Sequence, residues 1–345
     1  MSAPAELSSA ELSTRLVGFV ARELGVPAER VRAASLRRLA GGASRELFAV
    51  DLETPEGALE LVLRRDPPGR IGESDRGLEM RVLQAAAEAG VPVPRVHWGS
   101  SDPAVLGAPF FLMDRVEGET LARRLLRDPG FAQARRAMTR QLGAALARVH
   151  AVDVRRPELA ALPGPPPGAS PARAVVEQTA ERARALALEP HPVLELMERW
   201  LLERVPASGP AALVHGDYRI GNVIFGPEGL RAILDWELAH VGDPLEDLGW
   251  LCVRTWRFGS DALPVGGIGT REELVAAYEE AGGRRVDREA LRFWEACGNF
   301  RVAVVWLQQS RIFLDGKVPS VELASLGRRT AETEEELLRL LREEA

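Results

Sequence analysis

The chain has 345 residues, which is long for one minimal core and suits two domains or one large two-lobed unit. Hydrophobic residues make up 46% and charged residues 27%, the composition of a globular protein. The formal net charge of −6 argues against a nucleic-acid partner, because a phosphate backbone requires a clustered positive excess. The two cysteines, Cys252 and Cys297, form no CxxC motif, so neither a disulfide framework nor a thiolate zinc site is supported.

The first residues have the pattern of an amphipathic helix. They lack a basic region followed by a long apolar stretch, so we expect neither an export signal nor a membrane segment. Ser8 and Glu11 have the spacing of a capping box. Four apolar residues then recur at helical spacing: Leu12, Leu16, Phe19 and Val20. The sequence therefore predicts a leading helix in a cytoplasmic protein without a membrane partner.

The first third of the chain has strand patterns. Residues 36–66 indicate three short strands, with glycines between the first two. Residues 74–90 have helical spacing and end at a glycine, and two further strand candidates lie at 91–99 and 109–116. We expect residues 1–115 to form a β-rich unit with a leading helix and one inserted helix.

The rest of the chain is predominantly helical in pattern. A helix is predicted at 131–152, and a proline-rich loop at 162–170 precedes two helices within 172–205. Residues 212–237 indicate a strand, a sharp loop and two further strands, and the chain is again helical from about 245 to a last helix at 331–342. We therefore expect residues 116–345 to form a mostly helical unit, which gives an α+β fold with two lobes.

Three polar residues follow apolar strands at a spacing that suits phosphoryl transfer. In HGDYRIGN, Asp217 follows the apolar stretch AALV and precedes Asn222 by five residues. Asp235 ends a second apolar stretch thirteen residues further on. A strand–loop–strand ribbon would bring the three side chains to one end. One aspartate would accept the proton of an attacking hydroxyl, while the asparagine and the other aspartate would hold Mg²⁺ against a triphosphate.

Two segments carry a family resemblance. LVHGDYRIGNVIF and AILDWELAHVGDPLEDLGW resemble the catalytic and metal-binding motifs of the aminoglycoside phosphotransferase family, whose kinase-like fold is shared by choline kinases. The resemblance extends from Leu39 to about Leu341 and is greatest to a subgroup found alone in bacteria or fused to acyl-CoA dehydrogenases. It implies a bilobal protein-kinase-like fold and a kinase that uses ATP and Mg²⁺.

The resemblance implies a role for each polar residue of these segments. Asp217 would be the catalytic base, and Asn222 and Asp235 would be the Mg²⁺ ligands. Arg219, two residues after the base, would steady the transferring phosphoryl group, and His215 would organise the loop. Two further carboxylates are expected to be structural, pinning the loop and capping the next helix: Asp243 and Asp247.

Two backbone segments are the expected contacts of the nucleotide. The turn at 41–46 would cover the phosphates, because glycine lets backbone N–H groups approach phosphate oxygens closely. Its residues in this role are Gly41, Gly42 and Ser44. The strand at 110–116 would be the hinge that meets adenine. The residues in this role are Met113, Asp114 and Val116.

An arginine is the expected cation for the α- and β-phosphates. Strand alternation puts Arg64 on the face of Val62, and it puts Arg65 on the opposite face with the neighbouring leucines. The resemblance favours Arg64, with Glu79 as its partner on the predicted helix. The planar guanidinium suits both phosphate and carboxylate.

The acceptor is less constrained by the sequence. The family's architecture places residues 250–260 and 298–313 near it, and these contain arginines and tryptophans but no Asp or Glu. This composition favours an anionic or partly apolar acceptor, and the dehydrogenase-linked relatives imply a hydroxyacyl-CoA or a related metabolite. The candidate contacts are Trp236, Glu237, Arg254, Trp256, Arg257 and Arg301. The alternative is that these arginines pair with carboxylates elsewhere and that the tryptophans belong to the core.

Three other functions compete with this hypothesis. One is an antibiotic kinase that modifies amino sugars. Another is a catalytically silent nucleotide-binding protein, although such proteins usually lose the base or a metal ligand. The third is a metal hydrolase, for which no second histidine pair provides support; its ligands would be His215, Asp217, Asp235 and His240. The choice between ATP and GTP and the oligomeric state stay open.

Overall fold

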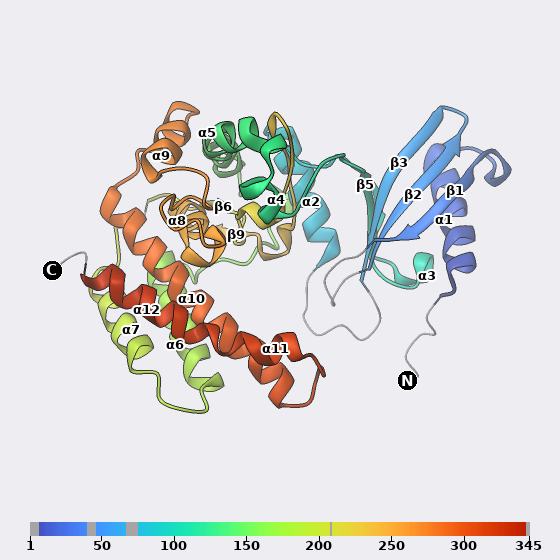
Figure 1. Ribbon diagram of the computed structural model, residues 1–345. Coiled ribbons are helices and arrows are strands. Elements are labelled where there is room, and N and C mark those ends of the chain that lie inside the picture. Colours follow the sequence, from blue (N-terminus) through green and yellow to red (C-terminus); the bar gives the residue numbers. More distant parts are fainter. Residues whose placement is uncertain (1–6, 40–45, 67–74, 208, 343–345) are drawn as a thin grey trace. The chain divides into compact units, whose positions relative to one another are not determined.

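The structure is a computed structural model that describes residues 7–39, 46–66, 75–207 and 209–342 (Figure 1). The expected nucleotide turn residues Gly41, Gly42 and Ser44 lie outside these ranges. The chain divides into two compact units. The N-terminal unit comprises residues 1–117 with two later segments, 156–161 and 232–237. The C-terminal unit comprises residues 118–155, 162–231 and 238–345.

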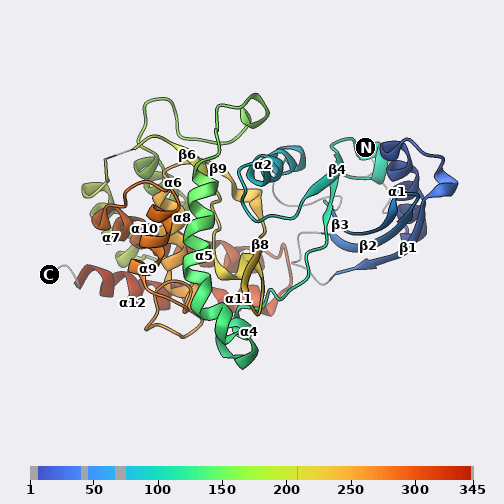
Figure 2. The ribbon, with the colours of Figure 1, turned by 90° about the horizontal axis from the view of Figure 1, so that it is seen from above.

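The N-terminal unit is built on a five-stranded antiparallel sheet (Figure 1, Figure 2). Its strands, in the order β1-β2-β3-β5-β4, are β1 (Arg32–Arg38), β2 (Glu46–Thr54), β3 (Gly57–Arg65), β5 (Phe110–Asp114) and β4 (Val96–Ser100). Its helices are α1 (Ser9–Leu24), α2 (Arg76–Glu88) and α3 (Pro103–Leu106). The strands and the inserted helix expected from the sequence are confirmed, whereas the one-turn α3 was not predicted.

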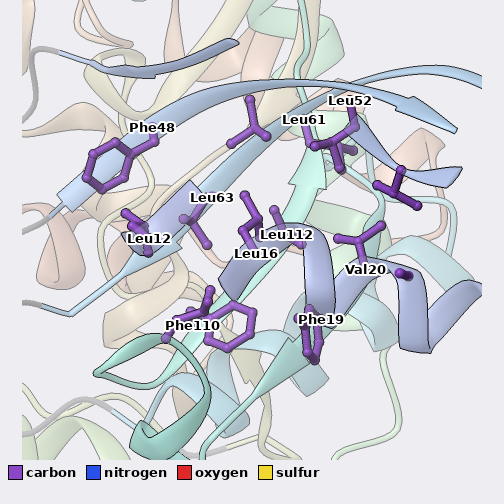
Figure 3. Packing of buried hydrophobic residues seen from close by; sticks show 14 residues of the cluster. Leu12, Leu16, Phe19, Val20, Phe48, Leu52, Leu61, Leu63, Phe110 and Leu112 are labelled. Carbon is purple, nitrogen blue, oxygen red and sulfur yellow. The ribbon is translucent and has the colours of Figure 1, made fainter. Parts of the chain in front are cut away.

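Helix α1 covers one face of this sheet. Its capping box is confirmed: the Ser8 hydroxyl accepts from the Glu11 amide at 3.3 Å, and the Glu11 carboxylate accepts from the Ser8 amide at 2.9 Å. Such a cap contributes about 1 kcal/mol. The four apolar residues of the predicted stripe are buried among side chains of β2, β3 and β5 (Figure 3). Phe19 meets Phe110 edge to face, with ring centroids 5.0 Å apart.

The C-terminal unit is mostly helical. Its helices are α4 (Ala122–Arg127), α5 (Ala132–His150), α6 (Pro171–Leu186), α7 (Pro192–Glu203), α8 (Leu245–Cys252), α9 (Arg271–Glu280), α10 (Arg288–Leu314), α11 (Val321–Leu326) and α12 (Arg329–Arg342). Helix α10 packs against α6, α8, α11 and α12, and α5 packs against α9. The predicted helices and the proline-rich loop agree with these bounds. Among the described residues, no helix is both long and apolar enough to span a bilayer.

The small β insertion differs from the expected ribbon. Strand β6 (Ala212–Val214) does not pair with the next strand but with β9 (His240–Gly242) in an antiparallel pair. Strands β7 (Val223–Gly226) and β8 (Gly229–Ile233) form their own two-stranded sheet. The prediction of one continuous ribbon was therefore wrong. Strand β9 was missed because three residues are too short to show alternation.

Candidate active site

The loop at 215–222 begins directly after the buried strand β6. Gly216 has φ 82°, and a Cβ there would lie 2.4 Å from the carbonyl oxygen of Leu238. Only glycine fits this turn, because the conformation and the close approach both exclude a side chain. His215 is completely buried, and its Nδ1 accepts from the Asp217 amide at 3.2 Å. The histidine thus lies where an organiser of the loop was expected.

The side chain of Asp247, in α8, binds the backbone of this loop. Its carboxylate accepts from the amides of His215 at 2.7 Å and Gly216 at 3.0 Å, and it lies 3.2 Å from Nε2 of His150. Burial pushes the pKa of Asp247 up, but the hydrogen bond and charge of His150 outweigh burial and hold that pKa below its usual value. Asp243 accepts from the Leu245 amide at 2.9 Å at the start of α8. Asp247 thus pins the loop as expected, whereas the N-cap of α8 is Pro244 and the expected side-chain cap is not formed.

Three N–H donors converge on the carboxylate of Asp217. Arg219 Nε donates to its two oxygens at 3.0 and 3.2 Å, and Asn222 Nδ2 donates to Oδ2 at 2.6 Å. The indole Nε1 of Trp250 donates to Oδ1 at 2.8 Å. The structure thus brings Asp217, Arg219 and Asn222 together. Trp250 was missed as a contact of Asp217, although it ends the quoted GDPLEDLGW segment.

The oxygens of Asn222 and Asp235 have the chemistry that Mg²⁺ prefers. The amide nitrogen of Asn222 makes both of its bonds to Asp217, to the carboxylate and to the carbonyl at 3.0 Å, which leaves the amide oxygen for a ligand. Asp235, two residues after β8, has φ 70°, a strained conformation for a residue with a side chain. A carboxylate and an amide oxygen are hard ligands, so the residues fit the metal.

The arrangement gives no support to a transition-metal centre. His240 uses both ring nitrogens elsewhere: Nδ1 lies 2.9 Å from the Leu238 carbonyl and Nε2 lies 3.2 Å from the Glu246 carboxylate. Within residues 7–342, leaving aside the segments that the structure does not describe, no three His, Cys, Asp or Glu side chains gather at ligand distances. The metal-hydrolase hypothesis therefore gains no geometric argument.

Arg64 lies between two carboxylates in the N-terminal unit. Its Nη1 lies 2.9 Å from Oε1 of Glu79, and its Nη2 lies 3.4 Å from Oδ1 of Asp235. Arg65 points to the opposite face and pairs with Glu46 at 3.6 Å. Both arginines are buried. The alternation expected along β3 thus places Arg64, and not Arg65, beside Glu79.

A second arginine beside Glu79 was not expected. Arg76, in the first turn of α2, pairs with the Glu79 carboxylate and lies 2.6 Å from Asp66. Burial lowers the pKa of Arg76, but the charges of Glu79 and Asp66 outweigh burial and raise the pKa above its ordinary value. The spacing of three residues within one helix was the sequence signal for this pair.

The hinge segment, residues 110–116, includes a backbone N–H without a described acceptor. The Asp114 amide donates to the Arg95 carbonyl at 2.9 Å, and the Arg115 amide donates to the Glu60 carbonyl at 3.0 Å. The structure gives the Val116 amide no acceptor among the described residues. Of the expected adenine contacts, Val116 therefore has a backbone N–H that no described acceptor takes up, whereas Met113 is buried in β5.

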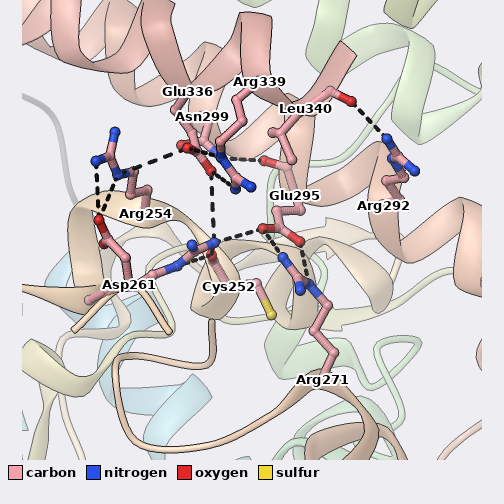
Figure 4. A network of polar contacts seen from close by, with 11 residues as sticks. Cys252, Arg254, Asp261, Arg271, Arg292, Glu295, Asn299, Glu336, Arg339 and Leu340 are labelled. Atoms are coloured by element: carbon pink, nitrogen blue, oxygen red, sulfur yellow. Dashed lines mark hydrogen bonds and ion pairs between the residues drawn. The ribbon is translucent and has the colours of Figure 1, made fainter. Parts of the chain in front are cut away.

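The arginines of the expected acceptor segments are paired with carboxylates, and Figure 4 shows one of these pairs, Arg254 with Asp261. Arg254 lies 3.1 Å from Asp261, and the buried Arg257 lies 2.8 Å from Glu295. Arg301 pairs with the buried Glu246. These pairs agree with the alternative stated for the sequence. The charge argument for an anionic acceptor therefore loses these three cations.

The tryptophans and Glu237 have different environments. Trp236 is 1% exposed, and its indole N–H donates to the Ile233 carbonyl at 3.3 Å, so it belongs to the core. Glu237 is half-buried. Trp256 is also half-buried, and the guanidinium of Arg219 lies 4.7 Å from its ring centroid. Trp256 thus contacts the Asp217 cluster directly, through Arg219.

A two-unit α+β fold with this loop defines a phosphotransferase of the kinase-like class. Residues 35–294 match the sequence model of the phosphotransferase enzyme family (APH), and the chain therefore belongs to this family. The resemblance drawn from the motifs is confirmed, as is the fold class.

Two relatives and one solved structure illustrate the similarity. Acyl-CoA dehydrogenase family member 10 of Mus musculus is 32% identical over 79% of this chain and 26% of its own length. Acyl-CoA dehydrogenase family member 11 of Homo sapiens is 29% identical over 81% of this chain and 36% of its own length. The chain thus spans about a quarter to a third of these relatives. A candidate aminoglycoside phosphotransferase from Ralstonia eutropha has a TM-score of 0.75 and 25% identity, covering 95% of this chain and 98% of that one.

Proposed function

We propose that the chain is an ATP- and Mg²⁺-dependent kinase that transfers the γ-phosphate to a hydroxyl group of a small molecule. The observation that carries this proposal is the Asp217 carboxylate, held by three N–H donors in a loop that the family match includes. Asp217 would accept the hydroxyl proton, a task that contributes about 10²- to 10⁴-fold to a rate. Arg219 would steady the phosphoryl group.

Four further residues would hold the metal and the nucleotide. Asn222 and Asp235 would bind Mg²⁺, which when bound neutralises charge on the triphosphate. We further propose that residues 1–115 act as the nucleotide-binding lobe. Arg64 would contact the α- and β-phosphates, and the Val116 amide would meet adenine. Residues 116–345 would carry the base and the acceptor.

A hydroxyacyl-CoA or a related anionic metabolite is the acceptor that we propose. The similarity to two members of an acyl-CoA dehydrogenase family supports this choice, although the chain covers only part of either. Because Arg254, Arg257 and Arg301 are paired with carboxylates, their positive charge no longer argues against a cationic acceptor. The solved relative described as a candidate aminoglycoside phosphotransferase keeps amino sugars as the second candidate class.

A reducing compartment, the cytoplasm, is the proposed location. Cys252 and Cys297 are both free and buried. Burial raises the pKa of Cys252 well above its ordinary value and raises that of Cys297 to about 12. These thiols therefore stay protonated and unreactive, as expected of core residues.

A screen for release of ADP tests the proposal. Wild-type protein and Asp217→Asn would be compared with Mg²⁺ and ATP across hydroxylated CoA esters, amino sugars and choline-like alcohols. We expect turnover with a 4-hydroxyacyl-CoA that the substitution abolishes. Turnover with an amino sugar and none with CoA esters would replace the acceptor class. Binding of nucleotide without turnover on any acceptor would favour the catalytically silent protein.

A further inference from the structure

Trp250 is a buried tryptophan whose indole N–H forms a hydrogen bond with the proposed base. The residue lies in α8 and is 6% exposed. Its indole N–H donates to Oδ1 of Asp217 at 2.8 Å. A hydrogen bond to a charged carboxylate is stronger than one between neutral groups, and it fixes the direction in which the carboxylate points. Trp250 thus acts on the side chain that would receive the hydroxyl proton.

Two side chains pack against the indole ring of Trp250. The guanidinium of Arg301 lies 4.8 Å from its centroid, and the ring of Trp256 lies 5.5 Å away. Arg301 is itself fixed by its ion pair with Glu246, which is 2% exposed. Because neighbours pack on the ring and hold it, the N–H has little freedom to turn away from Asp217.

Asp217 and three other side chains form a closed cycle of contacts. Asp217 accepts from Trp250, whose indole packs on Trp256. Trp256 carries the guanidinium of Arg219 on its face at 4.7 Å, and Arg219 Nε donates back to Asp217 at 3.0 Å. The Asp217 carboxylate therefore accepts hydrogen bonds from Trp250 and Arg219, and these two donors are linked to each other through Trp256. Such mutual restraint keeps a reacting group in one geometry.

We infer that Trp250 is a positioning residue for the proposed base, and that its indole N–H sets the orientation of the Asp217 carboxylate for transfer. This inference rests on the proposed function, because it assigns Trp250 a task only if Asp217 takes part in the reaction. In this role Trp250 acts through the base and does not itself contact the substrate.

The test removes the N–H and keeps the ring. Trp250→Phe retains an aromatic side chain against Arg301 and Trp256 but cannot donate. Trp306→Phe is the matched control: Trp306 belongs to the same apolar cluster and also carries an arginine on its ring, at 4.7 Å. Its indole N–H has no hydrogen-bond partner among the residues described.

The first readout needs no acceptor. The protein has seven tryptophans, so an ¹⁵N-labelled sample gives seven indole N–H signals. The Trp250 signal, assigned through bonds and checked by its loss in Trp250→Phe, is expected downfield. It should move upfield in Asp217→Asn, because a neutral amide accepts more weakly than a carboxylate. A Trp250 signal indifferent to Asp217→Asn would overturn the inference.

The second readout is the rate of ADP release with Mg²⁺, ATP and a 4-hydroxyacyl-CoA. Trp250→Phe should lower kcat about tenfold or more and leave the KM for ATP within about twofold, while Trp306→Phe keeps the wild-type kcat. An unchanged kcat in Trp250→Phe would overturn the positioning role. If Asp217→Asn keeps its activity, the proposed function fails instead. If wild type shows no turnover, the proposed acceptor is wrong, and the indole signal still tests the hydrogen bond between Trp250 and Asp217.

Discussion

Nη1 of Arg64 lies 2.9 Å from Oε1 of Glu79, and the two side chains are 7% and 2% exposed. The same guanidinium lies 3.4 Å from Asp235. A buried cation between two carboxylates is well placed to change partner when a triphosphate arrives, because phosphate oxygens take the same planar fork. Its neighbour Arg65 is also buried but pairs with Glu46 on the opposite face.

This difference gives a matched pair of substitutions. Arg64→Lys should raise the KM for ATP about tenfold, because an ammonium cannot reproduce the paired contacts of a guanidinium. Arg65→Lys should leave that KM unchanged and lower the melting temperature, because it disturbs a structural pair. Steady-state kinetics and thermal melts of both variants decide the matter. Equal effects on KM would remove Arg64 from the nucleotide site.

Gly216 is expected to tolerate no side chain. Gly216→Ala would place a methyl group 2.4 Å from the Leu238 carbonyl oxygen at φ 82°. Gly259→Ala is the control, because Gly259 has a similar φ of 87° but nothing within 4 Å of the added carbon. The positive φ costs about 1–2 kcal/mol in both. Only Gly216→Ala should also displace Asp217 and lower kcat by about 100-fold or more.

Measured kcat values and urea unfolding of the two variants separate strain from clash. Similar losses of stability and activity in both would mean that the backbone conformation alone matters. In that case the close approach of the loop to Leu238 would have no effect on kcat.

His240 and Glu246 make stability depend on pH. Burial lowers the pKa of His240, but its pairing with Glu246 outweighs burial and raises that pKa above its ordinary value. A raised pKa stabilises the folded protein fully below the unfolded value of about 6.5, and this contribution is lost as the pH rises through the folded value. Urea unfolding of wild type and His240→Gln from pH 5.5 to 9 should show a difference in unfolding free energy that shrinks with rising pH. A difference that grows with pH would contradict this pairing.

Local patterns were sufficient for much of the fold. The capping box at Ser8, the stripe of α1 and the alternation that separates Arg64 from Arg65 depend on neighbours in sequence, and each was predicted. The pairing of β6 with β9 was not, because so short a strand carries no period.

Contacts between distant residues set the rest of the candidate site. Arg257 meets Glu295, and Arg301 meets Glu246, across 38 and 55 positions. The composition of each segment showed an excess of arginine but could not show the partners. Trp250 is similar: its motif was quoted, yet its hydrogen bond to Asp217 depends on how α8 packs beside the loop.

The separate roles of Asp217 and Asp235 are the central claim, and one comparison tests it most directly. The affinity for Mg²⁺-ATP, measured by calorimetry, and the transfer rate would be determined for Asp217→Asn and Asp235→Ala. We predict that Asp217→Asn binds the nucleotide within about threefold of wild type and loses at least about 100-fold in kcat, and that Asp235→Ala binds it at least about tenfold more weakly. Equal loss of nucleotide binding in both variants, or transfer retained by Asp217→Asn, would contradict the account.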